Sequence, residues 1–470
     1  MKYLFINQSS FEKGGVSTLA LHFLKYESDC IFLNLNSDST YSSRNREFFL
    51  SWEESHHPET VSNIILLIFK IYPEEPFIII PNYGHIAHVA SALALLQNDK
   101  CRMLGICHNN QDATFELLKS FSPVFSHYLA VSKWVKNKLL HTLNKKNVSH
   151  IYPITIKSSV SSSINHTRPL RLIYVSRLTN VDKNALRLIP MIKGFIKSNF
   201  DFTLDIFGDG PCYFELESFI NDLKLGTSKI ILHGDASHSA VQKSFKDSDI
   251  LISLSSREGF GMAIAEAMGA KVVPLIMRFD GGICELLENG KNSILVNQED
   301  YGDLIAQLKK LDKNRELLDK IKCHAHKTIS YFQSPHNFFL KFREISLKCF
   351  LSDYPTIDIE EVKRLDPMFH ACNKMIKKIL GLNIKKVNVF GGGFFGRRVV
   401  DEICCYGIDV VCIYDSSLGD KNISYKGIKY YAPRLLCKNL PIIVCSLESK
   451  NEIINTLQKF DFPTSEIVSL

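Results

Sequence analysis

The sequence predicts an α/β protein with two successive parallel-sheet domains and a smaller third α/β domain. Short apolar runs rich in β-branched residues alternate with longer helical patterns, a rhythm typical of a parallel sheet covered by helices. The rhythm begins afresh at Leu170 and again at Lys385. In addition, a chain of 470 residues is too long to form one hydrophobic core.

The three domains are predicted at residues 1–158, 165–330 and 385–470. Strands of the first are expected at Tyr3–Asn7, Ile31–Leu35, Phe77–Pro81, Leu104–Cys107 and Tyr128–Val131. Strands of the second are expected at Leu170–Val175, Thr203–Phe207, Ile230–Leu232, Ile250–Ser253, Val272–Ile276 and Ser293–Val296. A polar, serine-rich stretch at residues 157–167 is predicted to link them, and residues 331–384 form a helical return segment and linker.

The composition is that of a globular enzyme, with 45% hydrophobic and 22% charged residues. The net charge of +7 fits anionic substrates or an anionic membrane surface, and nucleic acid is not expected as a partner. The 13 cysteines are dispersed without metal-ligand spacing, which favours reduced thiols in a cytoplasm. The first residues read as a strand, and no run is long enough to span a bilayer, so any membrane contact is expected to be peripheral.

The stretch from Lys133 to Asn147 has two interpretations. Its five lysines are mixed with Trp134 and several leucines, so it is predicted to form an amphipathic helix. Such a helix could contact an anionic inner membrane leaflet. The composition favours the other interpretation, a helix that covers the sheet with its apolar face and holds its lysines in water.

Two glutamates separated by seven residues dominate the second domain. Glu258 lies in a glycine-containing loop after a strand, while the apolar run that follows places Glu266 about one turn inside a helix. A helical carboxylate can accept hydrogen bonds from both hydroxyl groups of a ribose, and the loop carboxylate can accept them from the hydroxyl groups of a sugar. The stretch from Gly259 through Phe260 and Gly261 to Met262 is predicted to bring backbone N–H groups at the helix N-terminus to the anionic or hydroxyl-bearing part of the same ligand.

Two cations precede this pair in the same domain. Arg177 ends the first strand of the domain and Lys183 lies in the following loop, just before a helix. A forked cation, a point charge and a helix N-terminus together suit a pyrophosphate. Further on, His233 and Gly234 follow another strand and are expected near the base of a nucleotide.

The first domain offers two glycines and a histidine. Gly14 and Gly15 follow the first strand and permit close backbone approach to a phosphate, although their spacing is not that of a P-loop. His108 ends a strand at the edge where ligands of open α/β sheets bind. We expect it to face the cleft, with a structural histidine as the alternative.

The segment EGFGMAIAEAM resembles the E-x7-E signature of retaining glycosyltransferases of family 4, also called glycosyl transferases group 1. The downstream FDGGICE and the upstream Arg177 and Lys183 resemble further elements of that family, whereas Lys271 stands where the family usually has glycine. The resemblance implies the GT-B fold, in which two Rossmann-like domains face a cleft. It also implies that residues 336–350 pack back on the first domain.

The resemblance further implies the roles of the residues. Glu258, Arg177, Lys183 and His108 are the predicted catalytic residues, with the two cations neutralising the departing diphosphate. No cofactor is expected beyond the nucleotide-sugar co-substrate, and no metal, because the cations supply its charge. The expected acceptor is a saccharide or a lipid-linked saccharide of bacterial surface-polysaccharide or lipopolysaccharide assembly, at the cytoplasmic face of the inner membrane.

The third domain opens with a dinucleotide-type fingerprint. A strand leads into Gly391, Gly393 and Gly396 at the start of a helix, and a second strand ends at Asp415. The segment is similar to a small Rossmann-like domain fused to sugar-modifying acyltransferases and glycosyltransferases, where it implies an accessory nucleotide site. This fingerprint keeps an NAD-dependent sugar-nucleotide-modifying enzyme open as an alternative, beside a non-catalytic nucleotide-sugar-binding protein.

Overall fold

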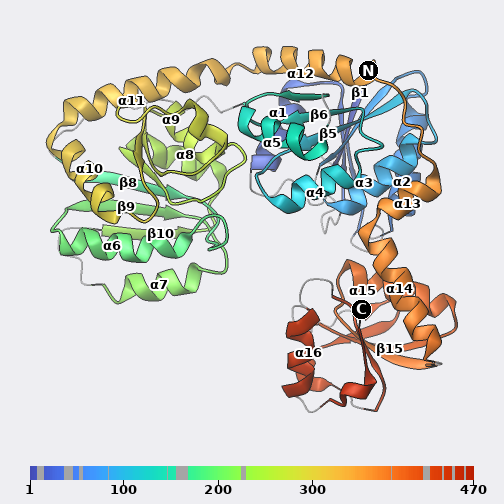
Figure 1. The fold of residues 1–470 in the computed structure, drawn as a ribbon. Helices are drawn as coiled ribbons and strands as arrows, with labels where there is room; N and C mark the ends of the chain where they lie inside the picture. Colours follow the sequence, from blue (N-terminus) through green and yellow to red (C-terminus); the bar gives the residue numbers. More distant parts are fainter. Residues whose placement is uncertain are drawn as a thin grey trace.

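The computed structural model describes residues 1–7, 15–35, 46–51, 55, 57–82, 84–144, 147–154, 168–223, 229–382, 384–415, 424–436, 439–446, 450–459 and 462–469. Three sheets organise these residues, each covered by helices (Figure 1). The first two domains lie side by side, and the third lies below the first and away from the second. The linker predicted at residues 157–167 falls outside the described residues.

The first domain is a seven-stranded parallel sheet in the order β3-β2-β1-β4-β5-β6-β7. Its strands are β1 (Lys2–Asn7), β2 (Cys30–Asn34), β3 (Glu47–Phe49), β4 (Phe77–Asn82), β5 (Cys101–Cys107), β6 (His127–Ala130) and β7 (Val148–His150). Its helices are α1 (Gly15–Tyr26), α2 (Pro58–Ile71), α3 (His85–Leu95), α4 (Asp112–Ser120) and α5 (Lys133–Leu143). The strand order reverses between β1 and β4, the kind of position where such sheets bind ligands.

The second domain repeats this plan with six parallel strands in the order β10-β9-β8-β11-β12-β13. Its strands are β8 (Leu170–Val175), β9 (Phe202–Phe207), β10 (Lys229–Gly234), β11 (Ile250–Ser253), β12 (Val273–Met277) and β13 (Ile294–Val296). Its helices are α6 (Leu188–Lys197), α7 (Tyr213–Asn221), α8 (His238–Asp247), α9 (Met262–Gly269), α10 (Tyr301–Lys313) and α11 (Arg315–Ser330). Here the order reverses between β8 and β11, so the predicted site residues gather at that point.

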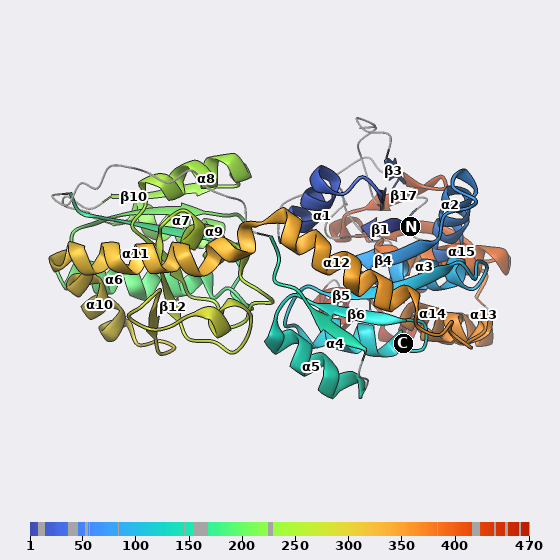
Figure 2. The ribbon, with the colours of Figure 1, turned by 90° about the horizontal axis from the view of Figure 1, so that it is seen from above.

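The chain then returns to the first domain, as predicted. Helix α12 (Pro335–Phe350) begins at the Ser334 cap and follows α11 across both domains (Figure 2). Its buried phenylalanines pack around Phe23 of α1, and Phe342 lies 4.7 Å from that ring. Arg343 forms a bidentate pair with the buried Glu27. The return helix therefore belongs to the core of the first domain.

The third domain has a six-stranded sheet in the order β16-β17-β15-β14-β18-β19. Its strands are β14 (Lys386–Phe390), β15 (Asp409–Tyr414), β16 (Ser424–Tyr425), β17 (Ile428–Tyr431), β18 (Ile442–Val444) and β19 (Ile467–Ser469). Helices α15 (Phe394–Cys405) and α16 (Lys450–Lys459) accompany the strands, and α13 (Ile359–Leu365) and α14 (Pro367–Gly381) precede them. His57 of the first domain pairs with Asp401 of α15 at 2.6 Å.

Helix α14 corrects the predicted boundary. The sequence places it in the segment 331–384, but its buried residues Cys372, Met375, Ile376 and Ile379 belong to the core of the third sheet. The chain crosses between the domains one helix earlier, near Asp366, whose carboxylate is buried against Arg398 of α15 at 2.5 Å. The third domain therefore begins at α14.

Truncation at the two boundaries should give different proteins. A chain ending at Leu365 is expected to fold as the first two domains, whereas one ending at Ile384 should expose the apolar face of α14 and bind a hydrophobic dye. Dye fluorescence and thermal unfolding of both chains measure this. Equal dye binding, with equal melting temperatures, would contradict the assignment of α14 to the third domain.

Candidate functional site

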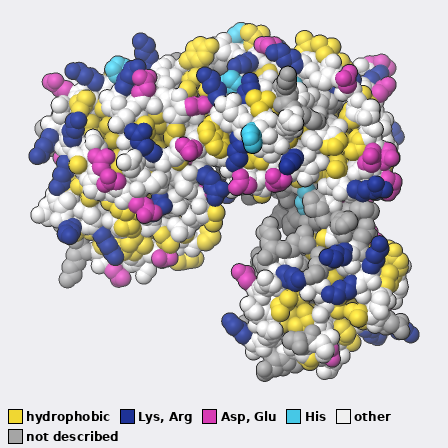
Figure 3. Space-filling view, viewed as in Figure 1, with side chains coloured by type: hydrophobic (Ala, Val, Ile, Leu, Met, Phe, Trp, Pro, Cys, Tyr) yellow, Lys and Arg dark blue, Asp and Glu magenta, His cyan; other side chains and the backbone are white. Residues whose placement is uncertain are grey.

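A cleft of about 1540 Å³ separates the first two domains at the carboxyl ends of their strands. Both domains contribute to its lining, with α1 and the ends of β4 and β5 on one side and the loops after β8 and β11 on the other. Charged side chains of both signs are interspersed over the visible face of the molecule (Figure 3). The modest net charge is not gathered into one large patch on that face.

Glu258 lies in the loop between β11 and α9, as predicted. Its Oε1 accepts a hydrogen bond from Ser255 Oγ at 2.9 Å and lies 2.6 Å from Lys183 Nζ. Both charged side chains are largely buried, with 15% of Lys183 and 17% of Glu258 exposed. The structure therefore brings the predicted phosphate cation and the predicted sugar carboxylate into one ion pair in the cleft.

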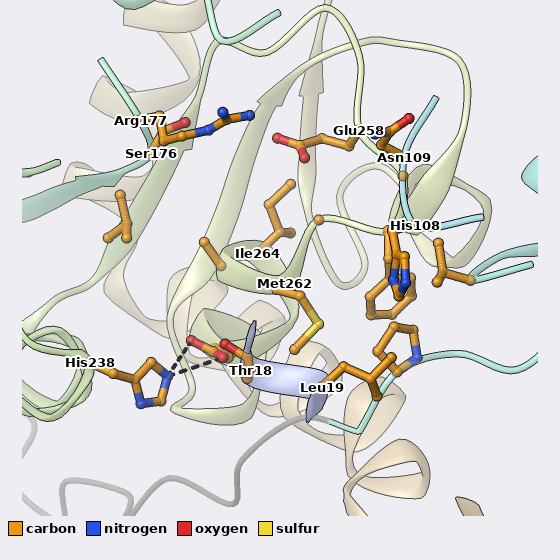
Figure 4. A pocket seen from close by; sticks show the side chains of 18 of the residues that line it. Thr18, Leu19, His108, Asn109, Ser176, Arg177, His238, Glu258, Met262 and Ile264 are labelled. Carbon is orange, nitrogen blue, oxygen red and sulfur yellow. Dashed lines mark hydrogen bonds and ion pairs between the residues drawn. The ribbon is translucent and has the colours of Figure 1, made fainter. Parts of the chain in front are cut away.

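Arg177 lines the cleft from the loop after β8. Its side chain is exposed, and among the described residues no ion pair engages it. Figure 4 shows Arg177 and Glu258 extending toward one another from two loops of the second domain, with His108 and Asn109 of the first domain beside Glu258. Arg177 thus offers an uncompensated guanidinium at the place where Lys183 is already paired.

The N-terminus of α9 opens onto the same space. Gly261 precedes the helix with φ 94°, a left-handed conformation that favours glycine, and its position carries no side-chain cap. The first N–H groups of a helix have no partner within it, so they remain available to an anion. Phe260 is held nearby by packing on Tyr152 at 5.6 Å, and its carbonyl accepts from Ile283 N.

Glu266 lies one turn into α9 and is only 5% exposed. His238 Nε2 lies 3.2 Å from both carboxylate oxygens, and Gln242 donates to one of them at 2.9 Å. The hydrogen bond to Glu266 raises the pKa of His238, because the carboxylate favours the charged ring. Sequence reasoning missed His238 and Gln242; their spacing of four on one face of α8 is the signal that marks them.

His108 faces the second domain from the end of β5. Its Nε2 is hydrogen-bonded to Asn82 Oδ1 at the end of β4, and burial lowers its pKa to about 4. The ring is therefore neutral at neutral pH. It lines the cleft together with the loop of Glu258, as the sequence predicts.

The two sides of the cleft touch at the glycine that follows Glu258. A Cβ atom at Gly259 would lie 2.1 Å from the carbonyl oxygen of His108, far inside contact distance. Beside this contact, Gln111 donates to Asp182 across the cleft at 2.7 Å. Only glycine permits this approach of the loop to the first domain.

The carboxylate of Glu285 also crosses between the domains. It accepts hydrogen bonds from the backbone of Lys133 at 2.9 Å and Trp134 at 3.2 Å, the first residues of α5. That helix has no acidic residue in its own first turn. Glu285 of the second domain therefore supplies the negative charge that a helix N-terminus favours, and it joins α5 to the interface.

Some predicted residues lie elsewhere. Gly14 is outside the described residues, and Gly15 is the first residue of α1. His233 and Gly234 are not among the residues that line the cleft. The His233 ring stacks on Phe207 at 4.1 Å and lies 2.6 Å from Asp205 Oδ1, beside a register irregularity in β10. The neighbouring Asp235 and Ala236 line the cleft instead.

An Asp-x-Asp spacing occurs at Asp247 and Asp249, at the amino end of β11. Asp249 is buried among Arg168 and Lys322, with oxygen to nitrogen distances of 2.6 and 2.7 Å. Burial alone would raise the pKa of the Asp249 carboxyl, but Lys322, the Arg171 backbone and Arg168 together lower it. Asp249 therefore has a structural role as the charged partner of these groups.

The glycine loop of the third domain engages its own neighbours. Gly392 N donates to Asp415 Oδ2 at 2.8 Å, and Gly392 O accepts from the Arg397 guanidinium and the Tyr430 hydroxyl, each at 3.1 Å. Gly391 has φ 101°, and a Cβ at Gly396 would meet its carbonyl oxygen at 1.8 Å. Gly393 caps α15. The glycines thus allow the tight turn and close backbone approach of a dinucleotide-type loop, while the Asp415 carboxylate is hydrogen-bonded to the loop itself.

The family model of glycosyl transferases group 1 matches residues 157–328, the part that carries Arg177, Lys183, Glu258 and Glu266. This part of the chain belongs to that family. An uncharacterized glycosyltransferase of Methanocaldococcus jannaschii is 29% identical over 189 residues, 40% of this chain and 50% of that protein. The lipopolysaccharide 1,6-galactosyltransferase of Salmonella typhimurium is 23% identical over 189 residues, 39% of this chain and 52% of that protein.

The chain spans about half the length of these curated relatives. Among solved structures, Anabaena HepE in complex with UDP and glucose has a TM-score of 0.61 at 16% identity, covering 74% of this chain and 99% of that chain. A mutant of Staphylococcus aureus TarM in complex with UDP, Fondaparinux and alpha-GlcNAc-glycerol has a TM-score of 0.59 at 13% identity, covering 75% and 100%. The first two domains therefore have the GT-B fold.

Replacing Gly259 tests the contact between the domains. Gly259→Ala should open the cleft, because the added methyl group overlaps the His108 carbonyl, and an overpacked contact costs about 1–3 kcal/mol. Small-angle scattering should show a larger radius of gyration. Trp134, which packs 3.2 Å from a Cβ position at Gly281 in the same interface, should change its fluorescence.

Gly302→Ala in α10 is the matched control, since its Cβ would meet only Asp300 at an ordinary 3.5 Å. It should keep the scattering curve and fluorescence of the original chain. An unchanged radius of gyration and Trp134 fluorescence in Gly259→Ala would mean that the loop does not need glycine for this approach.

Proposed function

We propose that the chain is a retaining glycosyltransferase that moves a sugar from a nucleotide-diphosphate sugar to an acceptor hydroxyl. One observation carries this proposal. Arg177, Lys183 and Glu258 meet beside the uncapped N-terminus of α9, in a cleft whose other wall holds His108. The set offers cations for a diphosphate and a carboxylate and a ring nitrogen for a sugar.

The donor is proposed to lie across the second domain. Its diphosphate accepts from Arg177, Lys183 and the N–H groups of Gly261 and Met262. Its ribose hydroxyls donate to Glu266, which His238 and Gln242 hold in place. Binding therefore separates Lys183 from Glu258, and each charge exchanges its present partner for a part of the donor.

The reaction proceeds on one face of the sugar. The acceptor oxygen attacks the anomeric carbon while the bond from that carbon to the phosphate oxygen breaks, and the leaving diphosphate takes the acceptor proton. Arg177 and Lys183 stabilise the charge that develops on the phosphate. Glu258 and His108 hold the transferred sugar beside the reacting carbon, and no metal or other cofactor is required in this scheme.

The acceptor is proposed to be a saccharide or lipid-linked saccharide of bacterial surface-polysaccharide or lipopolysaccharide assembly. Named relatives support this class, among them the Salmonella lipopolysaccharide galactosyltransferase and a Staphylococcus aureus poly(ribitol-phosphate) alpha-N-acetylglucosaminyltransferase. Among the described residues, no helix has the length and apolar character needed to cross a membrane. We propose a cytoplasmic enzyme with peripheral contact to the inner leaflet.

The amphipathic helix α5 contributes less to such contact than its composition suggests. Lys138 is bound to Asp112 at 2.8 Å and lies over the ring of Phe115, so its charge is used within the protein. Val135, Leu139 and Leu143 are buried. The apolar face of α5 therefore packs inside the protein, in agreement with the interpretation of this stretch as a helix that covers the sheet.

The third domain is proposed as an accessory nucleotide site at Gly391, Gly393, Gly396 and Asp415. The present contacts of its loop do not favour NAD chemistry. Asp415, which a dinucleotide would need for its ribose, is hydrogen-bonded to Gly392, and a Cβ at Gly392 would lie 2.1 Å from the Tyr430 ring. A dinucleotide ribose would therefore compete with Gly392 for the Asp415 carboxylate.

A panel of UDP-, GDP- and ADP-sugars tests the proposed function. At least one should raise the melting temperature and be hydrolysed in the absence of acceptor, because ligand binding stabilises the folded state by mass action. Hydrolysis should survive EDTA, since Arg177, Lys183 and the helix N-terminus stabilise the leaving group. Rates abolished by EDTA and restored only by magnesium or manganese would refute the metal-independent scheme, and no response to any donor would refute the function.

Glutamine substitutions separate the roles of the two glutamates. Glu266→Gln should weaken donor affinity, because the ribose loses a charged acceptor, and Glu258→Gln should lower turnover by loosening the transferred sugar. Loss of a charged hydrogen bond is worth about 1.5–3 kcal/mol, roughly tenfold to hundredfold. Calorimetry beside turnover measures both effects.

Glu288→Gln is the control, because this exposed carboxylate pairs with Lys291 on the surface and is not among the residues that line the cleft. Wild-type affinity and turnover in both Glu258→Gln and Glu266→Gln would remove the site from this motif. An exchange of the two effects would keep the site and reverse the roles.

A further inference from the structure

Three asparagines end three neighbouring strands of the first sheet. Asn34, Asn7 and Asn82 are the last residues of β2, β1 and β4, which lie next to one another. Asn7 is the direct register partner of both Asn34 and Asn82. Residues in register on parallel strands point to the same face of the sheet, so the three amides form a row along the carboxyl edge.

The amides form one continuous hydrogen-bonded ladder that ends on His108. Asn7 Nδ2 donates to Asn34 Oδ1 at 2.9 Å, and Asn82 Nδ2 donates to Asn7 Oδ1 at 3.1 Å. Asn82 Oδ1 then faces His108 Nε2. Asn34, Asn7 and Asn82 are 0%, 7% and 3% exposed, so the ladder is a buried polar element.

The direction of the ladder decides the state of the ring. Because Asn82 uses its Nδ2 to donate to Asn7, it presents only an acceptor oxygen to His108. The Nε2 atom must then carry the hydrogen, and Nδ1 of the neutral ring is left as an acceptor. Among the described residues, nothing else in the protein is hydrogen-bonded to His108, whose ring lines the cleft.

Such a ladder is costly to maintain. An apolar row at this edge of the sheet would avoid the desolvation of three amides. At the far end, Asn34 Nδ2 is buried with no hydrogen-bond partner among the described residues. An unsatisfied buried donor at the end of the ladder indicates that the row serves the cleft more than it serves stability.

We propose that the Asn34–Asn7–Asn82 ladder is a positioning device that holds His108 as the Nε2–H tautomer, so that Nδ1 accepts a hydrogen bond from a hydroxyl group of the transferred sugar. The inference rests on the proposed function for the hydroxyl group, while the tautomer is a property of the protein alone. The asparagines act through His108, which contacts the donor. If all three amides were reversed, Asn82 would donate to Nε2. His108 would then be the Nδ1–H tautomer and would present an N–H group to the cleft.

Nitrogen NMR of the full chain labelled with 15N-histidine measures the tautomer directly. The His108 signals are assigned by their loss in His108→Gln. At neutral pH the wild type should show a protonated Nε2 and a bare Nδ1. A bare Nε2 with a protonated Nδ1, or an equal mixture of both tautomers, would overturn the proposal whether or not any sugar is turned over.

Two substitutions at Asn82 test what the ladder does for turnover. Asn82→Leu removes the acceptor of Nε2–H, so His108 should show mixed tautomers and turnover should fall roughly threefold to tenfold, the usual effect of one neutral hydrogen bond. Asn82→Asp keeps the acceptor and adds a negative charge, so the Nε2–H tautomer and most of the turnover should return. An equal loss in both variants, with unchanged tautomers, would reduce Asn82 to a structural role.

The pH profile gives a readout that a structural role would not move. Protonation of Nδ1 destroys the acceptor, so wild-type turnover should fall as the pH drops toward the His108 pKa of about 4. The carboxylate of Asn82→Asp favours the charged ring and raises that pKa, so the acidic limb should move to higher pH. A limb that stays in place in Asn82→Asp would contradict the coupling between Asn82 and the ring.

Asn292→Leu is the matched control, because Asn292 is 1% exposed and its amide donates to Leu286 and Thr328, outside the cleft. It should lose stability without changing the His108 tautomer or the acidic limb. Monodeoxy forms of the donor that is turned over then locate the hydroxyl. Removing the contacted hydroxyl should lower turnover in the wild type but not in His108→Gln. If every monodeoxy donor lowers turnover as much in His108→Gln as in the wild type, the hydroxyl contact is refuted. The tautomer is then still decided by the NMR result.

Discussion

The contact between Gly259 and the backbone of His108 sets the geometry on which the rest of the cleft depends. A side chain at that point would hold the two domains apart, because its first carbon would lie 2.1 Å from a carbonyl oxygen. With glycine there, the loop that carries Glu258 reaches the end of β5. The interdomain hydrogen bond from Gln111 to Asp182 and the cap that Glu285 places on α5 both lie at this interface. Apolar contacts join the same interface, with Tyr152 packed on Phe260 at 5.6 Å and Trp134 lying 3.2 Å from a Cβ position at Gly281.

Within that cleft, the charges are arranged for exchange. Lys183 and Glu258 neutralise each other at 2.6 Å, which avoids leaving two largely buried charges unpaired. Arg177 has no such partner among the described residues and is exposed in the same space. In the proposed reaction, the diphosphate of the donor attracts both cations. Lys183 then leaves Glu258, whose carboxylate becomes available to the hydroxyls of the sugar.

The sequence allowed the prediction of those features that depend on local pattern. The loop position of Glu258 and the helical position of Glu266 follow from glycine spacing and an apolar run. The sheets of the first two domains follow from strand rhythm. His238 and Gln242 could not be assigned, because they reach Glu266 from α8, a separate element whose packing the pattern does not specify. The asparagine ladder requires the strand order and register of the first sheet. The contacts of His233 also depend on packing, because its ring stacks on Phe207 beside a register irregularity in β10.

Lys271 shows how the fold keeps the geometry of the site despite a departure from the family pattern. Helix α9 ends in a Schellman motif, in which Val272 N donates to Ala267 O at 2.9 Å and Lys271 N donates to Met268 O at 3.1 Å. This motif needs a left-handed residue after the cap, and Lys271 adopts φ 63° where glycine would be unstrained. The strain is on the order of 1–2 kcal/mol, and the buried residues of α9 and β12 offset it, because any other exit would move both elements out of the core. The turn thus fixes the direction from α9 to β12, and with it the position of Glu266. Packing of the two elements holds Lys271 in this conformation, against the backbone preference of lysine.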